Sequence, residues 1–236
     1  MLILGLDSSA AAAGAGIVKD GKVLSETYLN TGLTHSQTLL SLADSCLNNA
    51  GLALKDMDAL AVASGPGSFT GVRIGVSAVK GMAFPAQKPV YGISTLEALA
   101  VSAGVPGYLV CPVMDARCSQ VYNALFRQTE NGPERLTPDR PLKLEELAAE
   151  LRTRNETPLL VGDGAALTAA FLRNAGLPFC EFPEIYRYQH GSAVAFAAWM
   201  RYNNGDAGQD PDSLVPQYLR PSQAERERAA RLSREG

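Results

Sequence analysis

The chain has 236 residues, a formal net charge of −3, 46% hydrophobic and 19% charged residues, so it can bury the core of one large or two small domains. The slight negative charge argues against broad binding of a nucleic-acid backbone by this chain alone. Apolar runs all fall well short of the roughly 20 residues that span a bilayer, so we expect no membrane partner. No basic residue precedes Lys19 as a signal peptide would require, and four cysteines without CxxC spacing favour a reducing, cytoplasmic location.

The first hundred residues predict alternating strands and helices. Apolar runs between turn residues indicate strands, and apolar residues spaced at i, i+3 and i+4 indicate helices. Asp20-Gly21 between two such runs predicts a tight hairpin, and Gly51 is placed to end a helix. Strands are expected at 2–6, 15–18, 23–29, 58–63 and 89–93, and helices at 35–49, after the glycine-rich loop, and from Ser94 or Thr95 to 103.

The second half partly repeats the first. An apolar run at 108–114 ends at Asp115, as the first run ends at Asp7, and GDGA at Gly162 stands where the first half has GPGS at Gly65. Strands are expected at 108–114, 120–126 and 158–161, and helices at 144–151, 165–174 and 193–202. We therefore predict two related α/β lobes, 1–104 and 105–220, followed by a charged tail, 221–236.

The glycine-rich segment at 65–75, GPGSFTGVRIG, fits neither common phosphate-binding motif. No Lys-Ser/Thr follows Gly71, so it is not a Walker A loop. Its glycine spacing also fails the dinucleotide fingerprint by one residue. Backbone amides at the start of the next helix could still attract an anion, and a tight turn with close packing explains the glycines equally well.

A stripe of small residues continues from this loop into the helix. Gly71, Gly75 and Ala78 recur at i, i+4 and i+7, which lets another backbone approach closely although glycine lowers helix propensity by roughly 1 kcal/mol. The partner is either the helix at 35–49 or another subunit. Spacing alone does not decide between packing within the chain and contact between chains.

Asp7, followed by Ser8, is a candidate for holding a hydrated magnesium ion near a phosphate. Asp115 repeats its position in the second half, as expected of a two-lobed nucleotide binder. The alternatives are local turn hydrogen bonds at Asp7 and an ion pair within Asp115-Ala116-Arg117. At His35 a metal pair on a helix would need a ligand at i+4, where Leu39 stands, so we predict a structural or interface residue there and no metal site.

Seven motifs occur together in the order seen in the TsaB (YeaZ) family. They are LGLDSS, HSQTLL, GPGSFTGVRIG, GISTLEALA, MDARCSQVY, GDGA and PQYLR. The chain resembles this family over almost its whole length. The resemblance implies an α/β fold of the actin-like ATPase (sugar-kinase) superfamily, with two RNase-H-like lobes of which the second is reduced.

The resemblance also implies a function in tRNA modification. It implies that the chain is a non-catalytic dimerisation or scaffold subunit of a larger complex. That complex transfers a threonylcarbamoyl group from threonylcarbamoyl-adenylate to N6 of the adenosine beside the anticodon. The substrates are the tRNAs that read codons beginning with A. The implied partners are the catalytic subunit TsaD, the ATPase TsaE and a second copy when the chain is alone, with tRNA contacted indirectly. ATP and a divalent metal are expected on the partner subunits and no cofactor on this chain. The alternative is an ATP-binding phosphotransferase of the same superfamily.

Two sets of candidate site residues follow. TsaD-type subunits hold a metal with HxxxH, and here the matching segment from His35 to Leu39 lacks the second histidine. The two N-lobe helices are expected to form the partner interface, with His35, Leu39, Leu42, Cys46, Gly71, Arg73, Gly75, Ala78 and Met82. The candidate nucleotide-binding residues are Asp7, Ser8, Asp115, Gly162 and Gly164.

Overall fold

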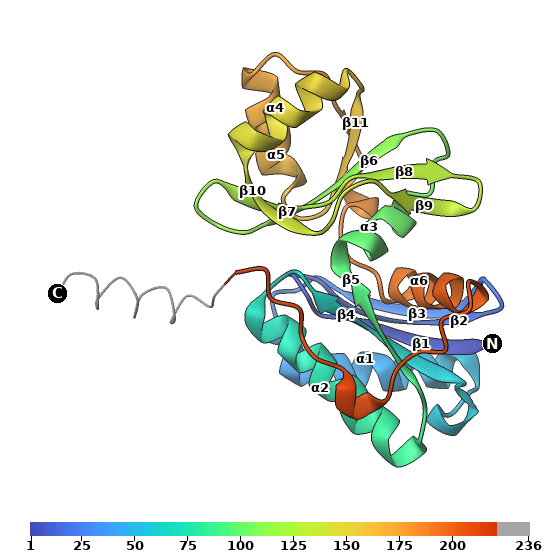
Figure 1. Cartoon of the computed structure of the whole chain (residues 1–236). Coiled ribbons are helices and arrows are strands. Elements are labelled where there is room, and N and C mark those ends of the chain that lie inside the picture. Colours follow the sequence, from blue (N-terminus) through green and yellow to red (C-terminus); the bar gives the residue numbers. More distant parts are fainter. Residues whose placement is uncertain (221–236) are drawn as a thin grey trace, which may run out of the picture.

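The computed structural model describes residues 1–220, which form two α/β lobes stacked on one another (Figure 1). Each lobe is built on its own β-sheet, and helix α3 (Thr95–Ala103) lies between them. Within this part of the chain no helix has both the length and the apolar character of a membrane span. The tail predicted at 221–236 lies outside the described residues.

The first sheet has five strands in the order β3-β2-β1-β4-β5. β1 pairs antiparallel with β2 and parallel with β4. Asp20 and Gly21 form the predicted two-residue hairpin turn, both with positive φ. The strands are β1 (Leu2–Asp7), β2 (Ala13–Lys19), β3 (Lys22–Leu29), β4 (Ala59–Gly65) and β5 (Val90–Ser94).

Helices cover both faces of this sheet. Helices α1 (His35–Ala50) and α2 (Phe69–Ala86) cover one face, and Gly51 ends α1 in the left-handed conformation as predicted. Helix α6 (Gly191–Asn203) covers the other face together with α3. The predicted second lobe, 105–220, is therefore wrong in its last part, because the chain returns to the first lobe at Gly191. No sequence pattern signals this return, because α6 is apolar on most of its surface and fits either sheet.

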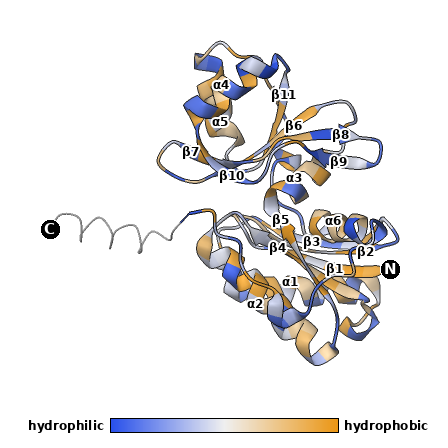
Figure 2. Cartoon of the chain, viewed as in Figure 1, coloured by the Kyte–Doolittle hydropathy of each residue, from blue (hydrophilic) through white to orange (hydrophobic). Residues whose placement is uncertain are grey.

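The second sheet repeats the order of the first. Its path is β10-β7-β6-β11-β12, with β8 and β9 attached beside β6. Helices α4 and α5 cover one face and α3 the other. Helix α4 alternates hydrophobic and hydrophilic residues, as one buried face requires (Figure 2). The elements are β6 (Leu109–Asp115), β7 (Gln120–Asn123), β8 (Phe126–Thr129), β9 (Gly132–Arg135), β10 (Arg140–Lys143), α4 (Leu144–Arg154), β11 (Pro158–Val161), α5 (Ala165–Asn174) and β12 (Cys180–Glu181), with short 3-10 helices at Leu54–Asp56, Glu184–Tyr186 and Pro211–Ser213.

The strand predicted at 120–126 is broken into β7 and β8. Pro112 of β6 has no amide hydrogen to donate to a neighbouring strand. The side-chain amide of Asn123 donates to the Pro112 carbonyl at 3.0 Å, which satisfies that carbonyl but does not replace the missing amide hydrogen. The chain then leaves β6, and the amide of Leu125 donates to Thr137 Oγ1 instead. A proline in the partner strand therefore explains the break.

A network of ion pairs joins α3 to both lobes. Arg201 of α6 donates to Glu97 Oε2 at 2.6 Å, and Arg135 of β9 lies 3.7 Å from the same carboxylate. Ser94 accepts the amide of Glu97 and caps α3 as predicted. A glutamate three residues after the cap can complete a capping box, but the Glu97 carboxylate pairs with these arginines.

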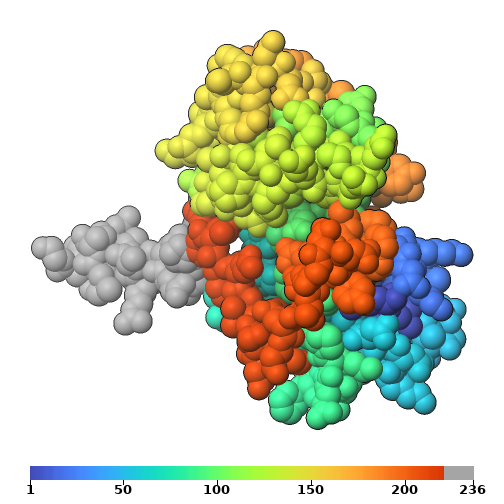
Figure 3. All heavy atoms as spheres, turned by 45° about the vertical axis from the view of Figure 1, so that its right-hand side comes forward, coloured from blue at the N-terminus to red at the C-terminus, as the bar shows by residue number. Residues whose placement is uncertain are grey.

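Residues 204–220, here called the C-terminal strap, run from α6 along the first lobe and reach the second (Figure 3). The strap pairs with the edge of the first sheet through two hydrogen bonds of 2.9 Å between Val90 and Gln209. Further on, the Gln217 amide donates to the Ser64 carbonyl at 2.7 Å. Arg220 donates to the carbonyl of Ala116 in the second lobe at 2.7 Å. The strap thus connects the two lobes on one side of the molecule.

Candidate functional site

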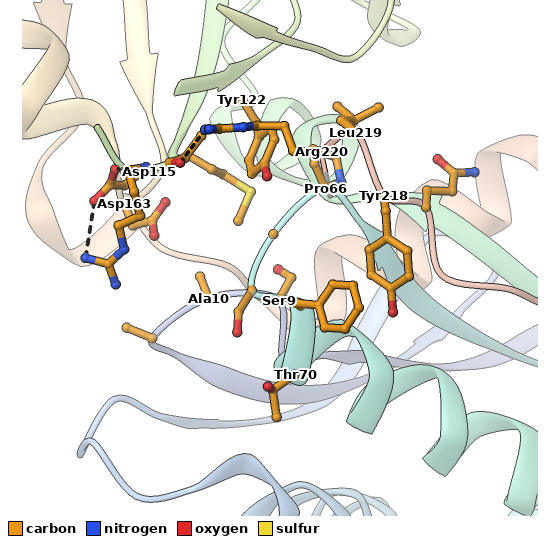
Figure 4. Close-up of a pocket in the computed structure, with 18 residues that line it drawn as sticks. Ser9, Ala10, Pro66, Thr70, Asp115, Tyr122, Asp163, Tyr218, Leu219 and Arg220 are labelled. Atoms are coloured by element: carbon orange, nitrogen blue, oxygen red, sulfur yellow. Dashed lines mark hydrogen bonds and ion pairs between the residues drawn. The ribbon is translucent and has the colours of Figure 1, made fainter. Parts of the chain in front are cut away.

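A cavity of about 600 Å³ lies between the lobes, at the carboxyl ends of strands β1, β4 and β6 (Figure 4). Loops at these strand ends are where α/β folds usually place their ligands. The lining comes from both lobes and from the strap. The lining residues are Ser9, Ala10, Ala11, Pro66, Gly67, Ser68, Phe69, Thr70, Met114, Asp115, Ala116, Arg117, Tyr122, Asp163, Gln217, Tyr218, Leu219 and Arg220.

Asp7 is fully buried beneath this cavity and does not line it. Its Oδ1 accepts hydrogen bonds from the amide and the hydroxyl of Ser9, at 2.8 and 2.6 Å. Its Oδ2 has no partner among the described residues. Burial raises the pKa of Asp7 from 3.8 to about 6, although the bonds from Ser9 oppose the shift. Asp7 therefore makes the local turn hydrogen bonds that were the alternative to a metal ligand.

The glycine-rich loop is closed by hydrogen bonds to the loop that follows β1. The Ser68 amide donates to the Ser9 carbonyl at 2.7 Å, and the Gly71 amide donates to Ser68 Oγ at 3.3 Å. Ser8 Oγ donates to the Gly71 carbonyl at 2.9 Å. These bonds use amides that an anion would need. At these positions the glycine-rich loop is therefore a tight turn, as the second of the two interpretations predicted.

Two carboxylates do reach the cavity, one of which the sequence analysis missed. Asp115 accepts the amide of Arg117 at 2.7 Å and lies 3.8 Å from its guanidinium, which is the predicted ion pair. Asp163, the aspartate of GDGA, lines the same cavity. Burial raises the pKa of Asp163 to about 6, and the nearby Asp115 carboxylate adds to the shift. The repeat of GPGS by GDGA was the available signal, because it placed Asp163 directly after the strand beside β6.

Gly162 and Gly164 do not line the cavity. The Gly164 amide donates to the Val113 carbonyl at 3.1 Å, and Gly162, with φ of 106°, packs against the same carbonyl. Both glycines serve close packing of the loop against β6. Of the five candidate nucleotide residues, Asp115 alone faces the cavity.

The cavity offers a magnesium-bound nucleotide only the carboxylates of Asp115 and Asp163. Magnesium takes oxygen ligands from carboxylates beside the phosphates, and the carboxylate predicted for that place, Asp7, is enclosed. Residues 1–220 contain no group of three or more histidine, cysteine, aspartate or glutamate side chains that could hold a metal. No catalytic step is therefore assigned to this cavity.

The predicted partner interface is only partly at the surface. Leu39, Leu42 and Cys46 belong to the core between α1 and the first sheet. Gly71 and Gly75 face inward, where a Cβ on Gly71 would clash with the Ser8 carbonyl and one on Gly75 would lie 2.8 Å from Ser8 Oγ. Leu42, Cys46, Gly71 and Gly75 therefore pack within the chain, whereas Leu39, although buried, also lines the groove described next.

Of the remaining predicted residues, His35, Arg73 and Ala78 line a groove of about 510 Å³, here called the α1–α2 groove, and Met82 does not. His35 sits at its rim, where Nε2 lies 2.6 Å from the Ala10 carbonyl, a structural contact. Arg73 is exposed and Ala78 and Met82 are half-buried. Sequence reasoning missed Leu40, which is 55% exposed, and Ile74. The groove is lined by His35, Ser36, Leu39, Leu40, Phe69, Thr70, Arg73, Ile74, Ser77 and Ala78.

Comparison with known proteins gives consistent matches. The family model of tRNA N6-adenosine threonylcarbamoyltransferase (TsaD) matches residues 30–226. The tRNA threonylcarbamoyladenosine biosynthesis protein TsaB of Bacillus subtilis is 30% identical over 237 residues, covering 95% of this chain and 96% of that protein. YeaZ from Pseudomonas aeruginosa superimposes with a TM-score of 0.79 at 26% identity, covering 92% of this chain and 99% of that one.

A more distant structural match concerns the fold alone. Component A of (R)-2-hydroxyglutaryl-CoA dehydratase from Acidaminococcus fermentans has a TM-score of 0.52 at 14% identity, covering 86% of this chain and 99% of that one. The two lobes with one repeated strand order have the α/β fold of the actin-like ATPases. By identity, coverage and fold together, the chain belongs to the TsaB (YeaZ) family.

Proposed function

We propose that this chain takes part in threonylcarbamoyladenosine formation in tRNA as a non-catalytic subunit that docks the catalytic subunit. Its relative in Bacillus subtilis is named for this biosynthesis, and the matching family model is named for the transferase. The transfer would move the threonylcarbamoyl group from its adenylate to N6 of the adenosine beside the anticodon, in tRNAs that read codons beginning with A. The chemistry would belong to the partner.

The enclosure of Asp7 is the observation that carries the non-catalytic part of this proposal. A carboxylate that handles a metal or a phosphate must face its ligand, whereas Asp7 is fully buried and bonded to Ser9. The two loops that would flank a phosphate bond to one another through Ser8, Ser68 and Gly71. We therefore assign ATP and the divalent metal to the partner subunits and no cofactor to this chain.

The α1–α2 groove is the surface that we propose for the catalytic subunit, which is a TsaD-type transferase. It lies on the outer side of both helices, and Leu40 is among its most exposed apolar residues. The same surface would serve self-pairing when the chain is alone. The ATPase TsaE would join the complex, and tRNA would be contacted indirectly.

A phosphotransferase acting on ATP is the second candidate, and the cavity with Asp115 and Asp163 is the feature in its favour. That reaction needs a metal held near the phosphates by Asp7 and Asp115 together. Titration calorimetry with ATP and magnesium tests it directly. We expect no binding heat from the isolated chain, and saturable magnesium-dependent binding would favour the phosphotransferase.

Reconstitution of the transfer reaction tests the proposed function. The transferase, the ATPase, tRNA and threonylcarbamoyl-adenylate are combined with and without this chain, and modified adenosine is measured. We expect the rate to fall at least about tenfold without the chain. Leu40→Arg in the groove should reproduce this loss, whereas Leu167→Arg on α5, also at an exposed leucine, should not. Full activity without the chain would refute the proposal.

A further inference from the structure

Arg73 is held in one orientation by two aromatic side chains. Its guanidinium lies 4.0 Å from the centre of the Phe69 ring, a cation–π distance. Its Nε donates to the hydroxyl of Tyr218 at 2.8 Å. Tyr218 belongs to the C-terminal strap and stacks on Phe69 with ring centres 4.3 Å apart. The strap therefore fixes a cation of the first lobe.

This cation has no ionic partner within the described chain. None of the ion pairs among residues 1–220 includes Arg73. Among residues 1–220 its one hydrogen bond uses Nε, so its two terminal nitrogens are not engaged by this part of the chain. A fixed guanidinium with both terminal nitrogens available matches the geometry of a carboxylate.

The α1–α2 groove around Arg73 contains no acidic residue. Its lining is apolar or hydroxylic apart from Arg73 and His35. On the two helices Asp44 is the only carboxylate, and the sequence of α2 has none. Among the described residues, Arg73 is therefore the one permanently charged residue in the groove lining.

The same charges disfavour a second copy of the chain as the preferred occupant. Two identical grooves would bring one Arg73 cation against another, and neither lining would supply a carboxylate, because Asp44 lies on α1 outside the groove. Asp44 also accepts the side-chain amide of Asn48 at 3.1 Å. A different protein with an apolar helix that carries an aspartate or glutamate would complement the groove better.

We propose that Arg73, positioned by Tyr218, selects a partner whose apolar docking helix carries a carboxylate, in preference to a second copy of this chain. The inference rests on the proposed docking of the transferase in the α1–α2 groove. Arg73 is the contact residue and Tyr218 is a positioning residue that acts through it. The strap, distant from α2 in the sequence, is thereby part of the partner surface.

Binding of the full-length variants to the purified transferase tests this inference. A charged hydrogen bond contributes about 1.5–3 kcal/mol, so Arg73→Met should raise the dissociation constant roughly 10- to 100-fold. Tyr218→Phe should raise it about 2- to 10-fold, and should add nothing in an Arg73→Met background. Lys55→Met makes the same charge change outside the groove and should alter binding less than about twofold. Circular dichroism checks that each variant is folded.

Self-association, measured by sedimentation velocity, separates the two kinds of partner. Arg73→Met should not weaken it, because the substitution removes a repulsive cation. The inference is wrong if Arg73→Met binds the transferase as well as the wild type does, or loses both associations equally. It is also wrong if Tyr218→Phe weakens binding in the Arg73→Met background. A wild-type chain that fails to bind the transferase removes the docking proposal itself, whereas wild-type binding unaffected by either substitution removes only this inference.

Discussion

Gly71 and Gly81 are both glycines of helix α2, but their surroundings in the fold differ. A Cβ on Gly71 would clash with the Ser8 carbonyl, whereas nothing lies within 4 Å of one on Gly81. We expect Gly71→Ala to lower the free energy of unfolding by about 1–3 kcal/mol through overpacking. Gly81→Ala should raise it by up to about 1 kcal/mol, because alanine favours the helix. Urea unfolding measures both, and equal effects would contradict the inward packing of the small stripe.

The same geometry changes the meaning of a substitution at Gly75. If the small stripe contacted another chain, Gly75→Leu would be a test of pairing between chains. In the structure Gly75 faces Ser8 and Val62, so a leucine there would disturb the fold first. Pairing is better tested at the exposed Leu40.

Asp7 predicts a dependence of stability on pH. Because burial raises its pKa from 3.8 to about 6, the folded state binds a proton more tightly than the unfolded state does. The carboxyl group therefore stabilises the fold below pH 4 relative to pH 6 and above, and this contribution is lost as the pH rises between them. Asp7→Asn does not titrate, so its stability relative to the wild type should rise by roughly 3 kcal/mol over that interval.

Urea unfolding of both proteins in steps from pH 4 to pH 7 measures this difference. Asn retains an oxygen that can accept the bonds from Ser9, so the slope with pH is the informative quantity. Parallel stability curves would show that Asp7 ionises in the fold as easily as in the unfolded chain.

Glu97 connects helix α3 to both lobes through ion pairs. The Glu97 side chain is 19% exposed and pairs with Arg201 of α6 and Arg135 of β9. Glu97→Gln keeps the shape but removes the charge, and should cost about 1–3 kcal/mol because the arginines lose a charged acceptor. Glu156→Gln, in the exposed pair with Arg127, is the matched control and should cost less than about 1 kcal/mol. Thermal and urea unfolding measure both losses of stability. Equal losses for Glu97→Gln and Glu156→Gln would show that the network does not stabilise the position of α3.

Periodicity predicted the helices and most strands because their patterns are local. The hairpin at Asp20-Gly21 and the end of α1 at Gly51 depend on backbone conformations that glycine favours. The break between β7 and β8 could not be predicted, because its cause is Pro112 in another strand. Similarly, Glu97 fits a capping box locally, but it pairs with arginines distant in the sequence.

At the scale of the whole molecule, the side chain of Arg220 links the strap to the second lobe and closes one side of the cavity between the lobes. Its guanidinium donates to the Ala116 carbonyl at 2.7 Å, and the Ala116 amide donates to the Gln120 carbonyl at 3.0 Å. Arg220→Met should therefore speed amide hydrogen exchange in residues 115–120 at least about threefold, since one bond of about 1 kcal/mol is lost. Arg152→Met on α4 is the control. Unchanged exchange in both would show that the strap does not restrain this loop.

The cavity was predictable in location but not in composition. The repeated strand ends at Asp7 and Asp115 placed a site between two lobes, because such loops meet at a cleft. The burial of Asp7 depends on Ser9 and on the glycine-rich loop, which pack together only in the fold. The strap residues that line the cavity follow the last helix, and no pattern in the sequence brings them there.

The packing of α6 on the first sheet has a consequence for synthesis on the ribosome. Gly191 and Ser192 lie so close to β1 and β2 that Gly5 and Gly16 leave no room for a side chain. Until residues 191–203 emerge, one face of the first sheet, including Ile3, Val18 and Ala61, lacks its cover. The strands and helices of the second lobe are synthesised in that interval. The first lobe to be translated is therefore the last to be completed, and the nascent chain presents an apolar surface that chaperones recognise.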